Sequence, residues 1–153
     1  MATENASTAD NQQERLDPWW IVGFVDGEGC FSISRFRNKT CKSGYQTLFE
    51  FVVTQGKSSQ RAMEAIKNYF GCGHIYLNRR YDNHRQHLLR FCVRRQADLK
   101  EIILPFFQKY PLQSAKRIQF QKFANEFMDR ESSETIRLAE LNSEDIVRSH
   151  GRP

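Results

Sequence analysis

Four segments of the chain alternate between apolar and polar residues with a period of two, the pattern of half-buried β-strands. They cover residues 30–37, 46–55, 73–81 and 86–95. A short polar turn separates the first segment from the second and the third from the fourth, so each pair predicts an antiparallel hairpin. This pattern limits the fold to a sheet with one apolar face and one polar face.

Segments with the apolar spacing of helices lie before, between and after the two hairpins. They cover residues 19–29, 58–70, 97–109, 114–130 and 133–148. Asp17 and Pro18 predict the start of the first helix, and Pro105 is expected to bend or end the third. The predicted order is αββαββα, an α+β fold with a four-stranded antiparallel curved sheet and helices on one face.

Positive charge is concentrated in the part of the chain that carries the strands. Residues 31–95 hold 13 Lys and Arg against three acids, whereas residues 1–30 have a net charge of −5 and residues 96–153 are neutral. A basic surface of this kind indicates a polyanionic partner, and nucleic acid is favoured because aromatic residues are interleaved with the basic ones. The alternative is a solvated basic face with no partner.

The length of 153 residues fits one domain. We expect a disordered leader over residues 1–16, a domain over 17–131, and a helix and tail of the same domain over 132–153. No apolar run approaches the roughly 20 residues of a membrane span, and the N-terminus lacks the apolar stretch of a secretory signal. The four cysteines form no CxxC pair, which favours reduced thiols in an intracellular compartment.

The sequence W-I-V-G-F-V-D-G-E-G at residues 20–29 resembles the signature motif of the LAGLIDADG homing endonucleases. Further matches follow at compatible spacing: C-F-S-I-S at 30–34, F-V-V-T-Q at 51–55, F-G-C-G at 70–73, and Y-P-L at 110–112 with Lys116 behind it. The resemblance covers residues 16–130 and implies the fold of that family. The chain holds one copy of the motif, and single-motif members of the family work as homodimers.

The resemblance also implies a catalytic site. Glu28 is the expected metal ligand, helped by the backbone carbonyl of Gly27, and two Glu28 carboxylates from a homodimer would form an oxygen site suited to Mg²⁺. Metal-assisted phosphodiester hydrolysis uses such a site to activate water and stabilise the leaving oxygen. Gln55 matches the family position that orders water, and Lys116 matches the basic residue near the scissile phosphate.

Two glycines, Gly23 and Gly27, lie four residues apart on one face of the first helix. Glycine costs about 1 kcal/mol in a helix interior, so the pair predicts close approach of a second helix. Together with the resemblance, this places the dimer interface at Val22, Gly23, Asp26 and Gly27. For Asp26, a structural hydrogen bond and a role as second metal ligand both stay open, and the motif favours the structural role.

The polar face of the sheet is the expected DNA-binding surface. A β-ribbon fits the major groove, where Arg, Gln and Asn can pair with base edges, while roughly half of the contacts are expected to reach phosphates instead. The candidates are Ser32, Ser34, Arg35, Arg37, Gln46, Glu50, Tyr76, Asn78, Arg80, Arg90 and Arg94. Phe36 departs from the alternation of its strand, so a β-bulge is an alternative there.

These expectations describe a site-specific endonuclease that binds a long pseudo-palindromic DNA duplex as a homodimer. It would hydrolyse one phosphodiester in each strand with Mg²⁺ and promote the mobility of an intron in an organelle or a microbial cytoplasm. No membrane and no small-molecule substrate are expected. The alternative is a non-cleaving module on the same fold, an intron RNA maturase or a DNA-binding regulator. The acid retained at Glu28 favours the enzyme.

Overall fold

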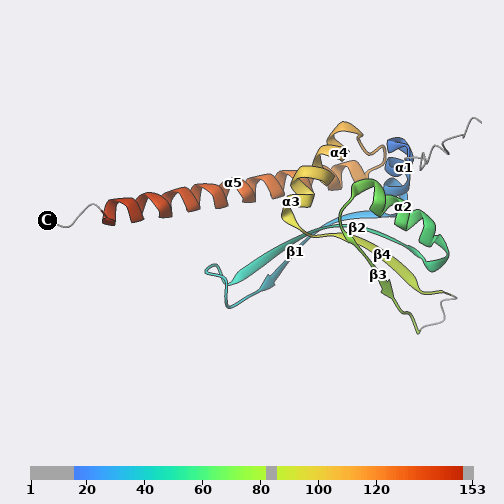
Figure 1. The fold of residues 1–153 in the computed structure, drawn as a ribbon, viewed down its shortest axis with the longest axis horizontal. Helices are drawn as coiled ribbons and strands as arrows, with labels where there is room; N and C mark the ends of the chain where they lie inside the picture. Colours follow the sequence, from blue (N-terminus) through green and yellow to red (C-terminus); the bar gives the residue numbers. More distant parts are fainter. Residues whose placement is uncertain (1–15, 82–85, 150–153) are drawn as a thin grey trace, which may run out of the picture.

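The computed structural model describes residues 16–81 and 86–149 of the chain. Most of the leader expected over 1–16 therefore lies outside the described residues. The α+β fold is confirmed: a four-stranded antiparallel sheet carries the helices on one side and leaves the other side open (Figure 1). The strands are β1 (Gly29–Arg37), β2 (Tyr45–Gly56), β3 (His74–Asn78) and β4 (Leu88–Val93).

The strand order across the sheet is β1-β2-β4-β3, so each predicted hairpin forms and the two hairpins join along β2 and β4. The pairing of β1 with β2 runs without interruption from Gly29 opposite Val53 to Arg37 opposite Tyr45. The bulge considered at Phe36 is therefore absent. An unbroken register means that the alternation assigns every residue of β1 to one face of the sheet.

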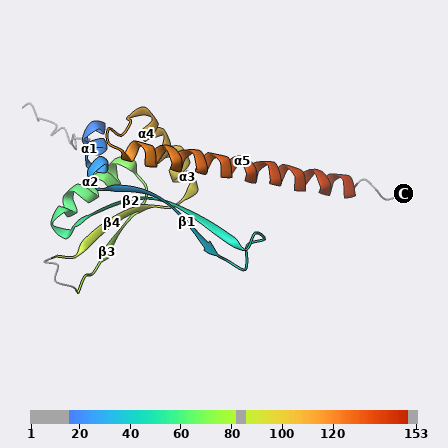
Figure 2. The same cartoon turned by 180° about the vertical axis from the view of Figure 1, so that it is seen from behind.

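The helices cover one face of the sheet, as the view from behind also shows (Figure 2). They are α1 (Pro18–Glu28), η1 (Lys57–Ser59), α2 (Gln60–Phe70), α3 (Gln96–Asp98), η2 (Leu99–Ile103), α4 (Leu104–Lys109) and α5 (Lys116–Ser149). The predicted start of α1 is confirmed, because the Asp17 side chain accepts a hydrogen bond from the Trp19 N–H at 2.7 Å. No helix within the described residues is both long enough and apolar enough to span a lipid bilayer.

Pro105 does not end its helical segment, which runs without a gap from Gln96 to Lys109. The segment instead changes its winding: η2 is a π-helical stretch over Leu99–Ile103, directly before α4 begins. Proline lacks the N–H of the helix ladder and its ring crowds the carbonyl of the preceding turn. A widened turn at this point removes that conflict while the helix continues.

The C-terminal part of the chain forms one helix of 34 residues, α5, and not the two helices expected over 114–130 and 133–148. The hydroxyls of Ser132, Ser133 and Thr135 donate to carbonyls four residues earlier, so these polar residues satisfy themselves within the helix. No glycine or proline interrupts the sequence between 116 and 149. The outer half of α5 extends beyond the sheet (Figure 1).

The hydrophobic core lies between the sheet and the helices and is rich in phenylalanine. Phe31 of β1 contacts the rings of Phe51, Phe107 and Phe123 at centroid distances of 5.0 to 5.5 Å. These rings come from β1, β2, α4 and α5 and are buried. Val25 of α1 and Phe120 of α5 belong to the same core, which fixes the end of α1 and the start of α5 on one sheet and positions the residues described next.

Candidate functional site

The C-terminal end of α1 presents an acid to solvent. α1 ends at Glu28, and both Gly27 and Glu28 are exposed. An acid at this end is unfavourable for the helix dipole, so Glu28 is not placed there to stabilise the helix. The last carbonyl groups of a helix also lack partners within the helix. The end of α1 therefore offers a carboxylate and backbone carbonyl oxygens together.

Lys116 brings a positive charge to this end of α1. It is the first residue of α5, and its Nζ donates a hydrogen bond to the carbonyl oxygen of Val25 at 3.1 Å. The same carbonyl accepts the backbone N–H of Gly29. The Lys116 ammonium thus lies one turn or less from Glu28 along α1, although the two residues are 88 positions apart in the sequence.

Asp26 holds the loop that leads into α5. Its carboxylate accepts hydrogen bonds from the backbone N–H of Gln113 at 2.8 Å, and from the N–H and hydroxyl of Ser114 at 3.1 and 2.7 Å. The Ser114 hydroxyl in turn accepts the N–H of Lys116 at 3.2 Å. Burial would raise the pKa of Asp26, but these bonds and the Lys116 charge outweigh it and hold the pKa below its ordinary value.

The network bears on the two roles considered for Asp26, a structural hydrogen bond and a second metal ligand. The carboxylate is engaged with Gln113 and Ser114 of its own chain, so the structural hydrogen bond is observed. These bonds tie α1 to the loop before α5, and a contact of Asp26 with a second copy of the chain stays a prediction.

Gln55 lies at the end of β2, close to the end of α1. Gly29, the first residue of β1, pairs with Val53, so the two chain segments run side by side where α1 ends. Gln55 is half-buried and pairs with Leu89 of β4. The three predicted catalytic residues therefore come from three elements whose ends meet at one corner of the sheet.

The oxygen ligands that one chain offers at this corner fit a divalent cation only if other ligands complete its coordination. No group of three His, Cys, Asp or Glu side chains that could hold a metal occurs among residues 16–81 and 86–149. One chain offers the Glu28 carboxylate and the carbonyl of Gly27, which are the hard oxygen ligands that Mg²⁺ binds. Further ligands would have to come from phosphates or from a second copy of Glu28.

The open face of the sheet carries most of the residues predicted to bind DNA. Phe49, Phe51 and Val53 are buried under the helices, so the alternate residues of β2 face the other way. The strand register places these predicted residues on the open face: Ser32, Ser34, Gln46, Glu50, Tyr76, Asn78 and Arg90. Arg94 joins them through its contact with Glu50.

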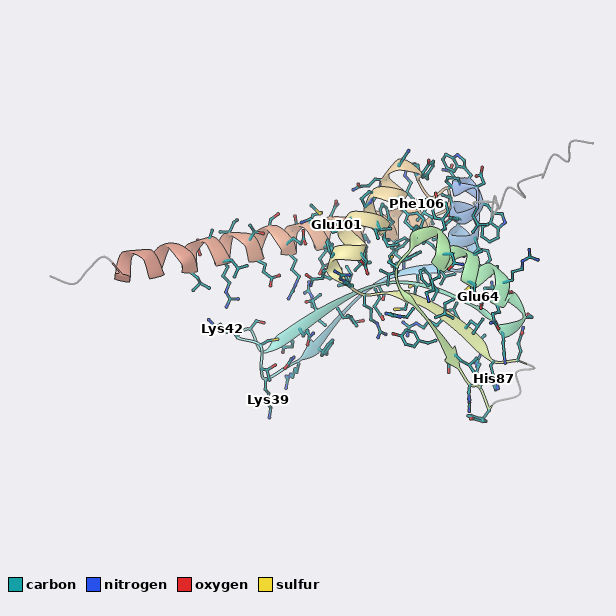
Figure 3. All side chains as sticks on the ribbon, viewed as in Figure 1. Lys39, Lys42, Glu64, His87, Glu101 and Phe106 are labelled. Atoms are coloured by element: carbon teal, nitrogen blue, oxygen red, sulfur yellow. The ribbon has the colours of Figure 1, made fainter. Side chains whose placement is uncertain are left out.

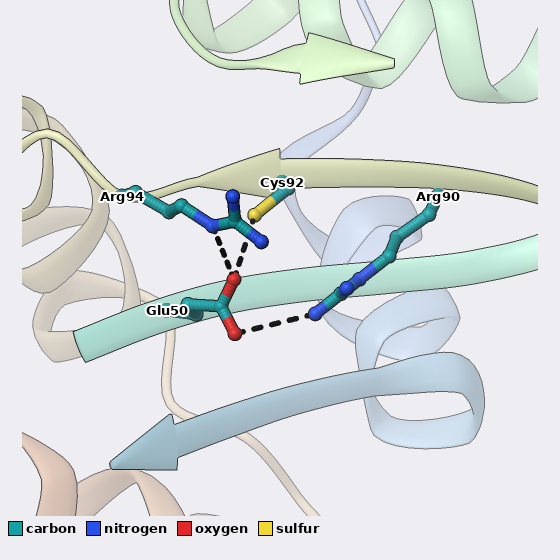
Figure 4. Close-up of polar contacts among 4 residues, drawn as sticks. All are labelled: Glu50, Arg90, Cys92 and Arg94. Carbon is teal, nitrogen blue, oxygen red and sulfur yellow. Dashed lines mark hydrogen bonds and ion pairs between the residues drawn. The ribbon is translucent and has the colours of Figure 1, made fainter. Parts of the chain in front are cut away.

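Glu50 lies on this face but is enclosed by basic residues (Figure 4). Arg90 Nη2 contacts its Oε2 at 3.2 Å, Arg94 Nε donates to Oε1, and the Cys92 thiol donates to Oε1 at 3.4 Å. Burial would raise the pKa of Glu50, but the bonds from Arg94 and Cys92 and the charges of both arginines hold it below its ordinary value. Burial also raises the pKa of the Cys92 thiol, so it remains a donor.

Two arginines predicted for the DNA-binding surface lie on the other side of the sheet. Arg35 shares the face of Phe31 and forms an ion pair with Glu126 of α5. Arg37 follows Arg35 by two residues in an unbroken register and takes the same face. The alternation from Phe31 already puts Arg35 on the helix side, and only a bulge at Phe36 would have turned Arg37 to the open face. Arg80 lies beyond β3, where its backbone N–H donates to His87 Nδ1 at 3.1 Å.

The sequence-based prediction of the DNA-binding surface did not include some residues of the open face. Thr54 lies opposite Arg90, and Leu48 and Cys92 share the face of Glu50. The alternation of β2 and β4 could have identified them. Two lysines, Lys39 and Lys42, stand at the tip of the β1–β2 hairpin, away from the helices (Figure 3). Their position in a basic turn was a signal for phosphate contact.

The glycines of α1 leave an open surface on the helix. Gly23 and Gly27 are exposed, and a Cβ built at either position meets no atom within 4 Å. Nothing in the described part of the chain therefore requires glycine at these positions. Val22, by contrast, is 2% exposed and belongs to the hydrophobic core of its own chain. The expectation that Val22 lies in a dimer interface is corrected for that reason.

The structure combines a sheet whose polar face is open with a helix, α1, that ends in an acid at one corner of the sheet. The same helix carries exposed glycines. These features together define a class of protein. The family model for LAGLIDADG endonucleases matches residues 21–127. The chain belongs to this family.

Two of the solved structures that resemble this chain illustrate the match. The homing endonuclease I-TnaI is 38% identical with a TM-score of 0.68, and the match covers 78% of this chain and 76% of that one. The meganuclease I-SmaMI bound to uncleaveable DNA is 29% identical with a TM-score of 0.67, covering 77% of this chain and 38% of that one.

A 50.9 kDa protein of Podospora anserina in ND4 intron 1 is 36% identical over 123 residues. The match covers 79% of this chain but only 26% of that protein. This chain thus spans about a quarter of that relative's length.

Proposed function

We propose that this chain forms the DNA-cleaving unit of a site-specific homing endonuclease. The observation that carries the proposal is the end of α1, where Glu28 is exposed and the Lys116 ammonium binds the carbonyl of Val25, three residues earlier. The structures that resemble this chain include a homing endonuclease and a meganuclease bound to DNA. Both support a phosphodiester as the substrate.

The proposed chemistry assigns a separate task to each residue. Glu28 and the Gly27 carbonyl would hold Mg²⁺, which supplies Lewis-acid charge at the phosphodiester when bound. Lys116 stabilises negative charge that develops on the phosphate, because its ammonium group is fixed by the Val25 carbonyl. Gln55 orients a water molecule for attack. The Asp26 network keeps Lys116 in place through Ser114.

We further propose that two copies of the chain assemble through α1. At this corner one chain supplies Glu28 and the carboxylate of Asp26, which is already bonded to Gln113 and Ser114. The exposed surface at Gly23 and Gly27 allows a second helix, with its own Glu28, to approach closely. Two open sheet faces would then lie along the major groove of a pseudo-palindromic duplex, and one phosphodiester of each strand would be cut. The relative encoded in an intron supports an intracellular role in intron mobility.

The test begins with selection of a binding site from a randomised DNA duplex library in Ca²⁺, a cation expected to support binding without hydrolysis. The selected duplex is then incubated with the protein in Mg²⁺ or in Ca²⁺. The proposal predicts staggered cleavage of both strands in Mg²⁺ and binding alone in Ca²⁺. Tight binding without cleavage under any divalent cation would contradict the nuclease and favour the non-cleaving module, with intron RNA as the next ligand.

A further inference from the structure

Glu50 is an acid in the middle of a basic surface. Among the described residues it is the one polar side chain that the structure buries, with 7% of its surface exposed. Arg90 and Arg94 on either side of it remain 39% and 47% exposed. The cluster therefore presents two guanidinium groups to solvent and keeps the carboxylate beneath them.

In this cluster both oxygens of the Glu50 carboxylate accept contacts, whereas each arginine uses only one of its nitrogen atoms (Figure 4). One oxygen of Glu50 contacts Arg90 at 3.2 Å, and the other accepts from Arg94 Nε and from the Cys92 thiol. Arg94 uses Nε for this bond, so among the described residues its terminal edge with both Nη atoms is left for another acceptor. An Arg edge with two N–H groups pairs with O6 and N7 of guanine, the commonest specific contact in the major groove.

Anchoring changes what an arginine can do on a DNA-binding surface. A free guanidinium on a long side chain follows the phosphate backbone as a mobile charge, and it loses rotamer freedom when it binds. Glu50 already restricts Arg90 and Arg94 in the free protein. It also neutralises one of the two positive charges, which weakens sequence-independent attraction to phosphates.

We propose that Glu50 is a positioning residue that fixes Arg90 and Arg94 for the recognition of guanine bases in the target duplex. This inference rests on the proposed function, because it requires duplex DNA against the open face. It also replaces the expectation that Glu50 itself contacts DNA: both carboxylate oxygens are already bonded.

The experiment compares base preferences, position by position, by selection from a randomised duplex library in Ca²⁺. The proteins are the wild type and the variants Glu50→Gln, Arg90→Ala and Arg94→Ala. Glu50→Gln should lose about tenfold of its preference for guanine at the positions where the two arginine variants lose theirs. The control Gln46→Ala, also on the open face of β2, should relax a different position.

A purely structural role would lower the melting temperature and weaken binding to all sequences alike, and this result would overturn the inference. Preferences of Glu50→Gln that match the wild type, or that relax at a position untouched by either arginine variant, would also overturn it. If Glu50→Gln does not fold, Arg94→Lys serves in its place, because it keeps the charge but loses the planar edge. Arg94→Lys should lose the preference for guanine at the same position as Arg94→Ala. A wild type that enriches no duplex would overturn the proposed function together with this inference.

Discussion

At the residue scale, Lys116 is the clearest case of a side chain placed for chemistry. Replacement by Met keeps much of its length but removes the charge at the end of α1. We expect Lys116→Met to lower the single-turnover cleavage rate by about 10²–10³-fold, in line with the loss of a fixed charge-stabilising donor. Duplex binding in Ca²⁺ should change little. Arg117→Met, an exposed neighbour, is the control, and an equal loss in that variant would contradict a specific role for Lys116.

Asp26 and Glu50 give the stability of the protein a dependence on pH. Both have a folded-state pKa below the ordinary values of 3.8 and 4.5. As the pH falls through these values, the unfolded chain takes up protons before the folded chain does, so the free energy of unfolding decreases. The contribution is fully present above the ordinary values and is lost as the pH falls through the folded ones.

Urea denaturation at pH 7 and at pH 4 measures this effect. The wild type should be less stable at the lower pH, and the variants Asp26→Asn and Glu50→Gln should each show a smaller difference between the two conditions. A wild-type difference that neither Asp26→Asn nor Glu50→Gln reduces would contradict the assignment.

At the element scale, α5 is a core helix in its first half and a solvent-exposed helix in its second. Phe127 is 2% exposed against Phe49 and Phe123, whereas Ile136 is 60% exposed. We expect Phe127→Ala to lower the free energy of unfolding by about 3–5 kcal/mol, the usual cost of a large cavity. Ile136→Ala should change it by less than about 0.5 kcal/mol. Denaturant titration of both variants checks this, and equal losses would show that the outer half is packed.

The elements also show which parts of the structure were predictable from sequence. The period of two in β1 and β2 is local, so the strands, the hairpins and the buried face of the sheet could be found. The continuity of α5 across Ser132 and Ser133 could not, because polar serines are typical of both helix ends and exposed helix surfaces.

Long-range contacts explain the other differences. Glu50 is buried by Arg90 of β4 and by Arg94 just after the end of that strand, which follow it by 40 and 44 residues. Nothing local in β2 indicates this. Arg35 is a different case. It is four residues after Phe31, so the alternation of β1 already placed it on the helix side, and its interpretation as a DNA contact was inconsistent with that alternation. Its partner Glu126 in α5 became visible only in the structure.

At the scale of the whole molecule, a substitution at the exposed glycines of α1 can change dimer formation without changing the folding of the single chain. Leucine forms helices better than glycine by about 1 kcal/mol, and a Cβ at Gly23 meets no atom within 4 Å of the described chain. Gly23→Leu should therefore keep or raise the melting temperature while it abolishes dimer formation and cleavage. Sedimentation with and without the selected duplex measures the assembly. Glu64→Leu, which adds the same side chain on exposed α2, should leave the dimer intact.

A dimer that survives in Gly23→Leu would place the contact between the two copies elsewhere on the molecule. A wild type that sediments as a monomer, both free and on the duplex, would contradict the assembly through α1 altogether.

The most direct test of the account is the single-turnover cleavage of the selected duplex by Glu28→Gln in Mg²⁺, measured beside its affinity for that duplex in Ca²⁺. The amide keeps the shape of Glu28 but removes the charge that would hold the cation. The account predicts that cleavage of both strands is lost while the affinity and the melting temperature remain near those of the wild type. Cleavage by Glu28→Gln at the wild-type rate would contradict the account.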